Sequence, residues 1–150
     1  MIINFLKTTC EISIEPTVFT KLQDFAQKSH PTEAGGILIG WWIKDNIHIE
    51  DVIEVTYADA TGNSWVREEA QAQAALDQKL ETSKDEKAGY VGDWHSHPAP
   101  IGASPQDIKS LKRSSKQYKN SLATIVCLSD GSFDIHSARR GRLNQTKLKG

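Results

Sequence analysis

The apolar positions of the chain recur with two periods, and these predict strands alternating with helices. Residues 10–14 alternate well enough for a short strand, and Pro16 then opens a helix of about 13 residues. One face of this helix is apolar and consists of Val18, Leu22, Phe25 and Ala26. The helix is expected to fade before Pro31, because the residue preceding a proline disfavours helical geometry.

A hairpin is predicted next. Residues 37–43 are largely apolar, which is typical of a buried strand. A turn signal at 44–46 leads to a partner strand at 47–55. The alternation slips inside this second strand, so we expect a bulge near Glu50 and Asp51. His48 lies among the alternating residues and is expected to face solvent.

The second half of the chain continues the same succession of element types. The pattern predicts a loop, a helix, a strand, a helix and a terminal hairpin, at about 58–64, 67–83, 88–97, 105–115, and 122–128 with 133–137. No internal repeat or linker divides the sequence. We therefore predict one domain over residues 1–150, of the α/β class, with a mixed β-sheet flanked by helices.

Composition narrows the function classes. The 150 residues carry 18 basic and 19 acidic side chains and a net charge of -1, which favours neither nucleic acid nor a membrane as partner. The sequence shows no signal peptide and no window near the roughly 18 apolar residues of a membrane span. Cys10 and Cys127 lie outside any Cys-x-x-Cys pattern, as expected for reduced thiols of a cytoplasmic protein. The basic residues between 139 and 149 are interpreted as a solvated tail.

The candidate chemistry is concentrated in Trp94-His95-Ser96-His97-Pro98 and in Ser104-Pro105-Gln106-Asp107. If the first segment is a strand, His95 and His97 point to the same side. Asp107 could then supply a third ligand from the next element. Two imidazoles and one carboxylate, with a fourth position left for water, make a catalytic zinc set.

A simpler interpretation exists for part of this pattern. His-x-His by itself is a weak metal signal. Ser104 to Asp107 also resembles an ordinary helix start, with a serine cap, a proline at the first helical position and an acid three residues after the cap. This interpretation accounts for Ser104 and Asp107 without a metal. It leaves the two strand histidines unexplained.

Glu33 is the candidate general base. An acid just before a strand is usually a surface charge. The adjoining Gly35 and Gly36 indicate that the backbone is closely approached at this point. A carboxylate lining a pocket beside such a turn can serve as a base.

Together these residues resemble the JAMM (MPN-plus) zinc metalloprotease family. Its pattern is a glutamate before a Gly-Gly strand, then His-Ser/Thr-His-Pro, then Ser-x-x-Asp, and all three parts are present here. The resemblance implies a cytidine-deaminase-like MPN/JAMM fold with one catalytic Zn²⁺ bound by His95, His97 and Asp107. It also implies Glu33 as general base and Ser104 as the oxyanion donor. Six residues separate His97 from Ser104, where the family pattern has seven.

Within that family the chain is similar to bacterial deconjugating peptidases of anti-phage operons. This resemblance implies cleavage of the amide or isopeptide bond after the C-terminal tail of a ubiquitin-like protein or of a conjugated cyclic-oligonucleotide synthase. Residues 57–87 take the place of an insertion that commonly contacts the ubiquitin-like partner. Two alternatives remain open: trimming of a sulfur-carrier protein, and a non-catalytic MPN-type binding module.

The tryptophans are the candidates for contacts with a substrate tail, with Trp65 and Trp94 as the predicted binding residues. An extended tail could pair with a sheet edge, and the loop at 61–66 is the expected edge. Each tryptophan has a competing interpretation as core or pocket wall, because aromatic residues carry much of the packing in a small domain.

Overall fold

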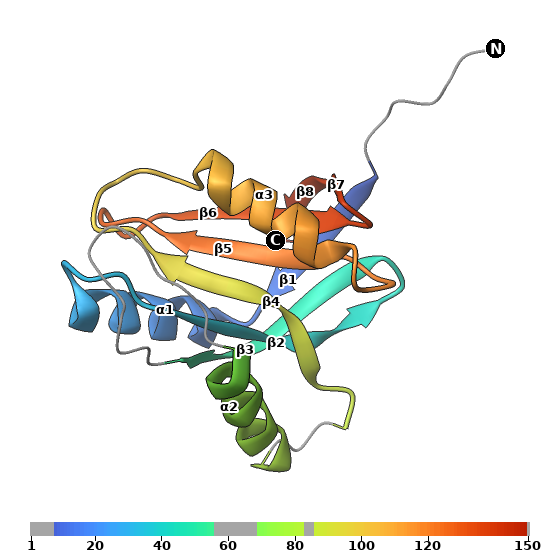
Figure 1. Ribbon diagram of the computed structural model, residues 1–150, viewed down its shortest axis with the longest axis horizontal. Coiled ribbons are helices and arrows are strands. Elements are labelled where there is room, and N and C mark those ends of the chain that lie inside the picture. Colours follow the sequence, from blue (N-terminus) through green and yellow to red (C-terminus); the bar gives the residue numbers. More distant parts are fainter. Residues whose placement is uncertain (1–7, 56–68, 83–85, 150) are drawn as a thin grey trace.

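The computed structural model describes residues 8–55, 69–82 and 86–149. Its described strands form one eight-stranded sheet in the order β7-β6-β5-β4-β2-β3-β1-β8 (Figure 1). The elements along the chain are β1 (Thr9–Ile14), α1 (Pro16–Ser29), β2 (Gly35–Ile43), β3 (Asn46–Glu54), α2 (Glu69–Thr82), β4 (Gly89–Ser96), α3 (Pro105–Ser115), β5 (Leu122–Cys127), β6 (Phe133–Arg139), β7 (Arg142–Leu143) and β8 (Gln145–Leu148). Parallel pairs (β4 with β5, and β1 with both β3 and β8) occur beside antiparallel ones. The predicted mixed sheet is confirmed.

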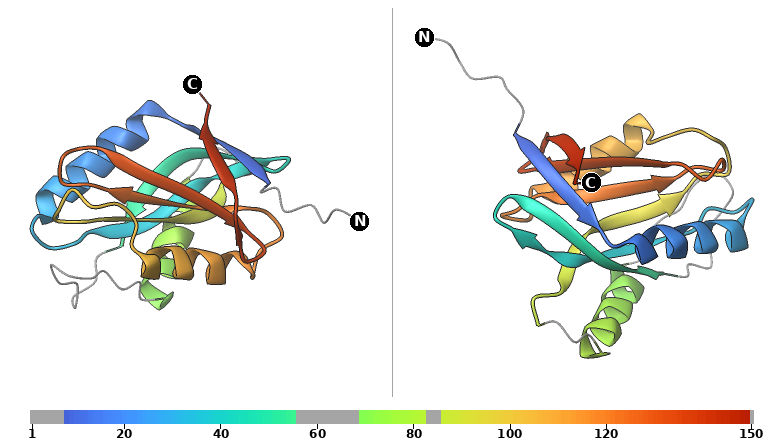
Figure 2. Two further views of the ribbon diagram at one scale, coloured as in Figure 1. Left: turned by 90° about the horizontal axis from the view of Figure 1, so that it is seen from above. Right: turned by 180° about the vertical axis from the view of Figure 1, so that it is seen from behind.

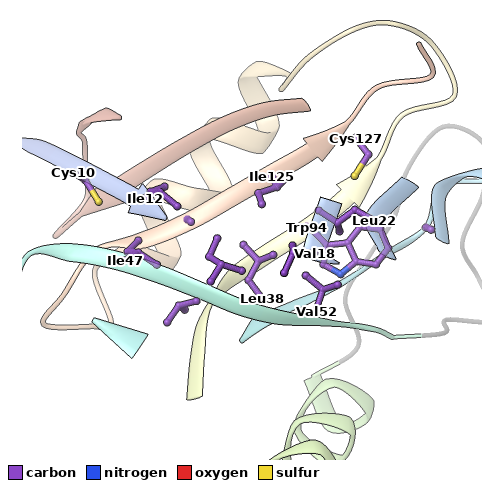
Figure 3. Close-up of a cluster of buried hydrophobic side chains, with 14 residues drawn as sticks. Cys10, Ile12, Val18, Leu22, Leu38, Ile47, Val52, Trp94, Ile125 and Cys127 are labelled. Carbon is purple, nitrogen blue, oxygen red and sulfur yellow. The ribbon is translucent and has the colours of Figure 1, made fainter. Parts of the chain in front are cut away.

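Helix α1 covers one face of the sheet, and α2 and α3 cover the other (Figure 2). The apolar face predicted for α1 is confirmed, since Val18 and Leu22 are fully buried and Phe25 and Ala26 pack against the same cluster. Figure 3 shows Val18 and Leu22 together with Trp94 and with strand residues such as Leu38 and Ile125. This cluster is the main core, and it includes Val91 and Trp94 of β4, the strand that leads to the candidate site.

The opposite face has two smaller apolar clusters. Helix α2 places Ala72 against Ile37 and Ile39 of β2, and α3 places Leu111 against β5 and β6. Strand β2 is therefore buried on both sides, which explains its almost continuous apolar sequence. None of the helices in the described part of the chain is long and apolar enough to cross a membrane.

Strand β3 has the predicted bulge. Ile39 pairs with Asp51 and Gly40 pairs with Ile49, so Glu50 is the extra residue. The Asp51 carboxylate accepts the Val52 amide at 2.8 Å and ion-pairs with Lys21 of α1 at 2.6 Å and Lys79 of α2 at 2.8 Å. The bulge thus links the helices on both faces to one strand.

The prediction that His48 faces solvent is wrong. Its side chain is 16% exposed, with Nδ1 2.7 Å from the hydroxyl of Ser13 and Nε2 3.2 Å from the carboxylate of Glu15. Strand β1 lies beside β3 and supplies Ser13, so the outward face at this point is a polar contact between strands.

The basic C-terminus is not the predicted tail, although most of its charged side chains are exposed as expected. Residues 142–148 form β7 and β8, and β8 pairs in parallel with β1. Between them Asn144 is buried and donates its side-chain amide to the hydroxyl oxygens of Ser121 and Ser137, at 3.0 and 3.1 Å. Arg142 and Lys147 lie on β7 and β8, the two edge strands of the described sheet. Charged residues are common on edge strands, so a polar sequence does not exclude a strand.

Candidate metal centre

The two histidines lie at the end of β4. His95 pairs with Gly35 of β2 and with Val126 of β5, and the His97 amide donates to the carbonyl of Cys127 at 2.9 Å, just beyond the strand. Because Ile125 and Cys127 belong to the core under α1, Val126 and its neighbour His95 lie on the opposite face. The two Nε2 atoms are 3.1 Å apart, which confirms that the histidines project together.

The backbone sets the orientation of His97. Its Nδ1 lies 2.8 Å from the carbonyl oxygen of Ile101. A carbonyl only accepts, so Nδ1 carries the proton and donates it, which leaves the Nε2 lone pair free. This arrangement is typical of a metal-ligating histidine, whose second ring nitrogen is usually hydrogen-bonded.

Asp107 arrives from the start of α3. Ser104 accepts the Asp107 amide on Oγ at 3.1 Å, and Asp107 Oδ2 accepts the Ser104 amide at 2.8 Å, which makes the predicted capping box. The same Oδ2 lies 3.3 Å from His95 Nε2 and 3.4 Å from His97 Nε2. The carboxylate of Asp107 thus both completes the capping box and serves as the candidate ligand. Its burial raises the pKa, but hydrogen bonds from His95 and from the Ser104 amide outweigh burial and hold the pKa of Asp107 well below its usual range.

Glu33 is a buried carboxylate at the same site. It is 5% exposed, and Oε1 lies 3.8 Å from His97 Nε2. Burial raises the pKa of Glu33, while His95 and His97 act in the opposite direction. Glu33 is therefore not the exposed surface charge that usually precedes a strand. Because burial raises its pKa, its carboxylate accepts a proton more readily than that of an exposed glutamate.

Ser96, between the two histidines, fixes Glu33 relative to them. Strand alternation turns its side chain away from theirs, where Oγ accepts the Ala34 amide at 2.8 Å. The Ser96 amide donates to the Ala34 carbonyl at 2.9 Å. Gly36 completes the close fit, because a Cβ there would overlap the Ile53 carbonyl oxygen and come within 2.8 Å of Trp94 Nε1. The close approach predicted from the two glycines is confirmed.

These donor atoms can hold a metal ion. Glu33, His95 and His97 each place a ligand atom within 4.8 Å of the others. The two Nε2 atoms and Asp107 Oδ2 form a tighter triangle, with edges of 3.1, 3.3 and 3.4 Å. Tetrahedral zinc with bonds of about 2.0–2.1 Å separates its ligands by about 3.3 Å. Both sets share the histidine pair, and the triangle that includes Asp107 matches the tetrahedral spacing.

The two tryptophans predicted to bind substrate have different outcomes. Trp94 is fully buried, stacks on Phe25 with ring centroids 5.5 Å apart, and donates its indole N–H to the Ile53 carbonyl at 2.9 Å. A side chain enclosed in this way has no surface for a substrate, so the prediction for Trp94 is wrong and it is a core residue. Trp65 and the predicted edge at 61–66 lie outside the described residues.

Sequence reasoning missed two positioning groups at the site. Ser96 lies between the histidines in the sequence, so strand periodicity predicts that its side chain points to the opposite face. That periodicity is the signal from which a contact with the start of the neighbouring strand at Ala34 could be predicted. The Ile101 carbonyl carries no signal in the sequence, because its role depends on the path of the backbone.

Comparison with known proteins identifies a family and a similar fold. Residues 15–140 match the family described as prokaryotic homologs of the JAB domain. The fold is similar to the solution structure of protein DSY2949 from Desulfitobacterium hafniense, with a TM-score of 0.65, 19% sequence identity and coverage of 92% of each chain. No curated protein matches the sequence. The matched segment contains Glu33, both histidines and Asp107, and with the MPN/JAB fold it shows that the chain belongs to the prokaryotic JAB-domain family.

Proposed function

We propose that the protein is a zinc-dependent peptidase. Its reaction is hydrolysis of the amide or isopeptide bond after the C-terminal tail of a ubiquitin-like protein or of a conjugated signalling enzyme. The carrying observation is the triangle of His95 Nε2, His97 Nε2 and Asp107 Oδ2, with a buried carboxylate, Glu33, 3.8 Å from one of the histidines. Membership of the JAB-domain family supports this chemistry.

In this proposal His95, His97 and Asp107 hold one zinc ion. When bound there, zinc polarises the scissile carbonyl and lowers the pKa of water to about 7. Glu33 accepts the proton of the attacking water on its carboxylate and passes it to the leaving amine. The raised pKa of Glu33 suits both halves of this transfer, because the carboxylate must first take up a proton and then release it.

Ser104 is the proposed oxyanion donor. Its Oγ accepts the Asp107 amide, which uses a lone pair and leaves the hydroxyl proton available to donate. The loop of six residues after His97 still ends in a helix cap next to the candidate ligand. One donor aimed at the developing oxyanion contributes on the order of 3 kcal/mol.

The proposed partner is a ubiquitin-like protein, or a conjugated cyclic-oligonucleotide synthase, that presents an extended C-terminal tail. The tail would lie along a sheet edge near residues 61–66, with Trp65 as a contact. The resemblance to deconjugating peptidases of anti-phage operons supports a cytoplasmic role in antiviral defence.

The test combines metal content with cleavage of a single modifier fused through its tail to a reporter. The expected result is one zinc per chain and cleavage that stops on chelation. Glu33→Gln should keep zinc and fold but lose cleavage, while the exposed Glu11→Gln control behaves like the wild type. A metal-free protein that only binds the modifier would indicate a binding module. Cleavage of a free carrier but of no conjugate would indicate trimming, and an active Glu33→Gln protein would remove Glu33 as the base.

A further inference from the structure

Asp134 of β6 contacts the loop that follows His97. Its Oδ2 accepts the Ala103 amide at 2.7 Å, and its Oδ1 lies 2.9 Å from His136 Nε2. A Cβ at Gly102 would overlap Asp134 Oδ2, so the carboxylate also lies directly against the backbone there. Burial raises the pKa of Asp134, but the Ala103 amide and His136 outweigh it and lower the pKa below its ordinary value.

Strand register places Asp134 in the same row of the sheet as His95 of the candidate metal centre, two strands away. It pairs with Val126 of β5, which pairs in turn with His95 of β4. Paired residues on neighbouring strands project to the same face, so Asp134 and His95 share one row and one side of the sheet. Asp134 thereby reaches the loop that joins His97 to Ser104, although it lies 31 residues beyond Ala103 along the chain.

The loop segment that Asp134 holds serves two of the candidate ligands. The Ile101 carbonyl accepts the Nδ1 proton of His97 at 2.8 Å, and Ser104 caps the helix that carries Asp107. Ala103 lies between these two positions, next to Ser104. Fixing its amide therefore restrains both the rotation of His97 and the approach of Asp107.

We propose that Asp134 is a positioning residue of the metal centre, acting through Gly102 and Ala103 to hold the Ile101 carbonyl on His97 and the Ser104 helix start against the histidines. Its role in catalysis rests on the proposed function, whereas its role in placing His97 does not. Asp134 makes no direct hydrogen bond or ion pair with Glu33, His95, His97 or Asp107; its side-chain partners among the described residues are the Ala103 amide and His136.

The first test uses metal-free protein and ¹⁵N NMR of the His97 ring. The wild type should show the Nδ1–H tautomer. Asp134→Ala should give a mixture of tautomers and faster exchange of the Ala103 amide proton. Asp134→Asn keeps an acceptor for that amide and should restore the wild-type signature. Asp130→Ala is the matched control, because this acid lies in the turn before β6 and bonds only with Ser132 among the described residues.

The second test measures zinc affinity by competition with a chromogenic chelator. Loss of an outer hydrogen bond typically weakens metal binding 10–100-fold, so we expect about a tenfold loss for Asp134→Ala. Gly102→Ala should cause a similar loss of zinc affinity in the wild type but no further loss in the Asp134→Ala background. Both changes disrupt the same contact, that between the Asp134 carboxylate and the backbone at residues 102 and 103.

Unchanged tautomer and unchanged zinc affinity in a folded Asp134→Ala protein would overturn the inference, as would fully additive losses in the double variant. Thermal melting of each metal-free variant separates these results from general unfolding, and Asp134→Asn serves if the alanine variant fails to fold. A wild type that binds no zinc would defeat the proposed function alone, since the tautomer of His97 still decides the positioning role.

Discussion

His48 in β3 and His97 just beyond β4 both lie against acids, and they differ in the groups that converge on their ring nitrogens. His48 and His97 have equally buried side chains, both 16% exposed. Both ring nitrogens of His48 have separate partners, Ser13 and Glu15, which belong to the neighbouring strand and its end. At the end of β4, His97 uses Nδ1 for a backbone carbonyl and turns Nε2 toward the Nε2 of His95 and the Oδ2 of Asp107.

The difference teaches that burial and an acid partner do not make a metal centre. A candidate metal centre needs three donor atoms that meet at one point, each able to offer a lone pair to the ion. A histidine within a strand, such as His48, contacts the residues beside it in the neighbouring strand and at that strand's end. At the end of β4 the chain is met by a helix start, whose capping acid points back at the histidines.

The largest expected effect separates the two histidine sites directly. His97→Ala should abolish stoichiometric zinc binding, because it removes one of three ligands. His48→Ala should leave zinc content unchanged and lower the free energy of unfolding by about 1 kcal/mol through its lost hydrogen bonds. Metal analysis and urea unfolding of the two purified variants measure both. Zinc loss in His48→Ala with an intact fold would contradict the distinction.

The two serines allow a second comparison. Ser104→Ala should lower kcat by about 100- to 1000-fold, the usual effect of one lost oxyanion donor, and should also weaken the helix cap. Ser13→Ala removes only a bond to His48 and should leave kcat unchanged. Steady-state kinetics on the modifier fusion provide the measurement. Equal kcat values in both variants would assign Ser104 a capping role alone.

A third prediction concerns Ser96, which bonds the strand of the histidines to the residue after Glu33. Ser96→Ala leaves the buried Ala34 amide without its acceptor and should lower the free energy of unfolding by about 1–3 kcal/mol. Urea denaturation measures the loss. Ser129→Ala, an exposed serine after β5, is the control and should have almost no effect.

The smallest effect is a change in acid stability of the metal-free protein. Because the folded pKa of Asp107 lies below its unfolded value of about 3.9, its stabilising contribution is present above about pH 4 and is lost as pH falls from there through the folded pKa. Asp107→Asn should therefore reduce the decline in stability below pH 4. Unfolding curves at successive pH values test this, and an unaltered decline would show that Asp107 gains nothing from His95 without a metal.

The main elements and the candidate ligands could be predicted because their signals are local. Helical spacing marked α1, the apolar run marked β2, and the Ser104 cap marked the start of α3. The histidines follow from strand alternation, and Glu33 from the glycines beside it. The resemblance to the JAMM family assigns these segments to one site, although they lie far apart in the sequence.

The sequence by itself determined the succession of strands and helices, the donors available for a metal and the family to which they point. Only the tertiary structure decided which groups act on those donors. It placed β8 beside β1, enclosed Trp94 in the core, gave His48 its partners, and brought Asp134 to the loop through the row it shares with His95. Periodicity and capping act within a few residues, whereas strand register and burial join residues that the sequence keeps far apart.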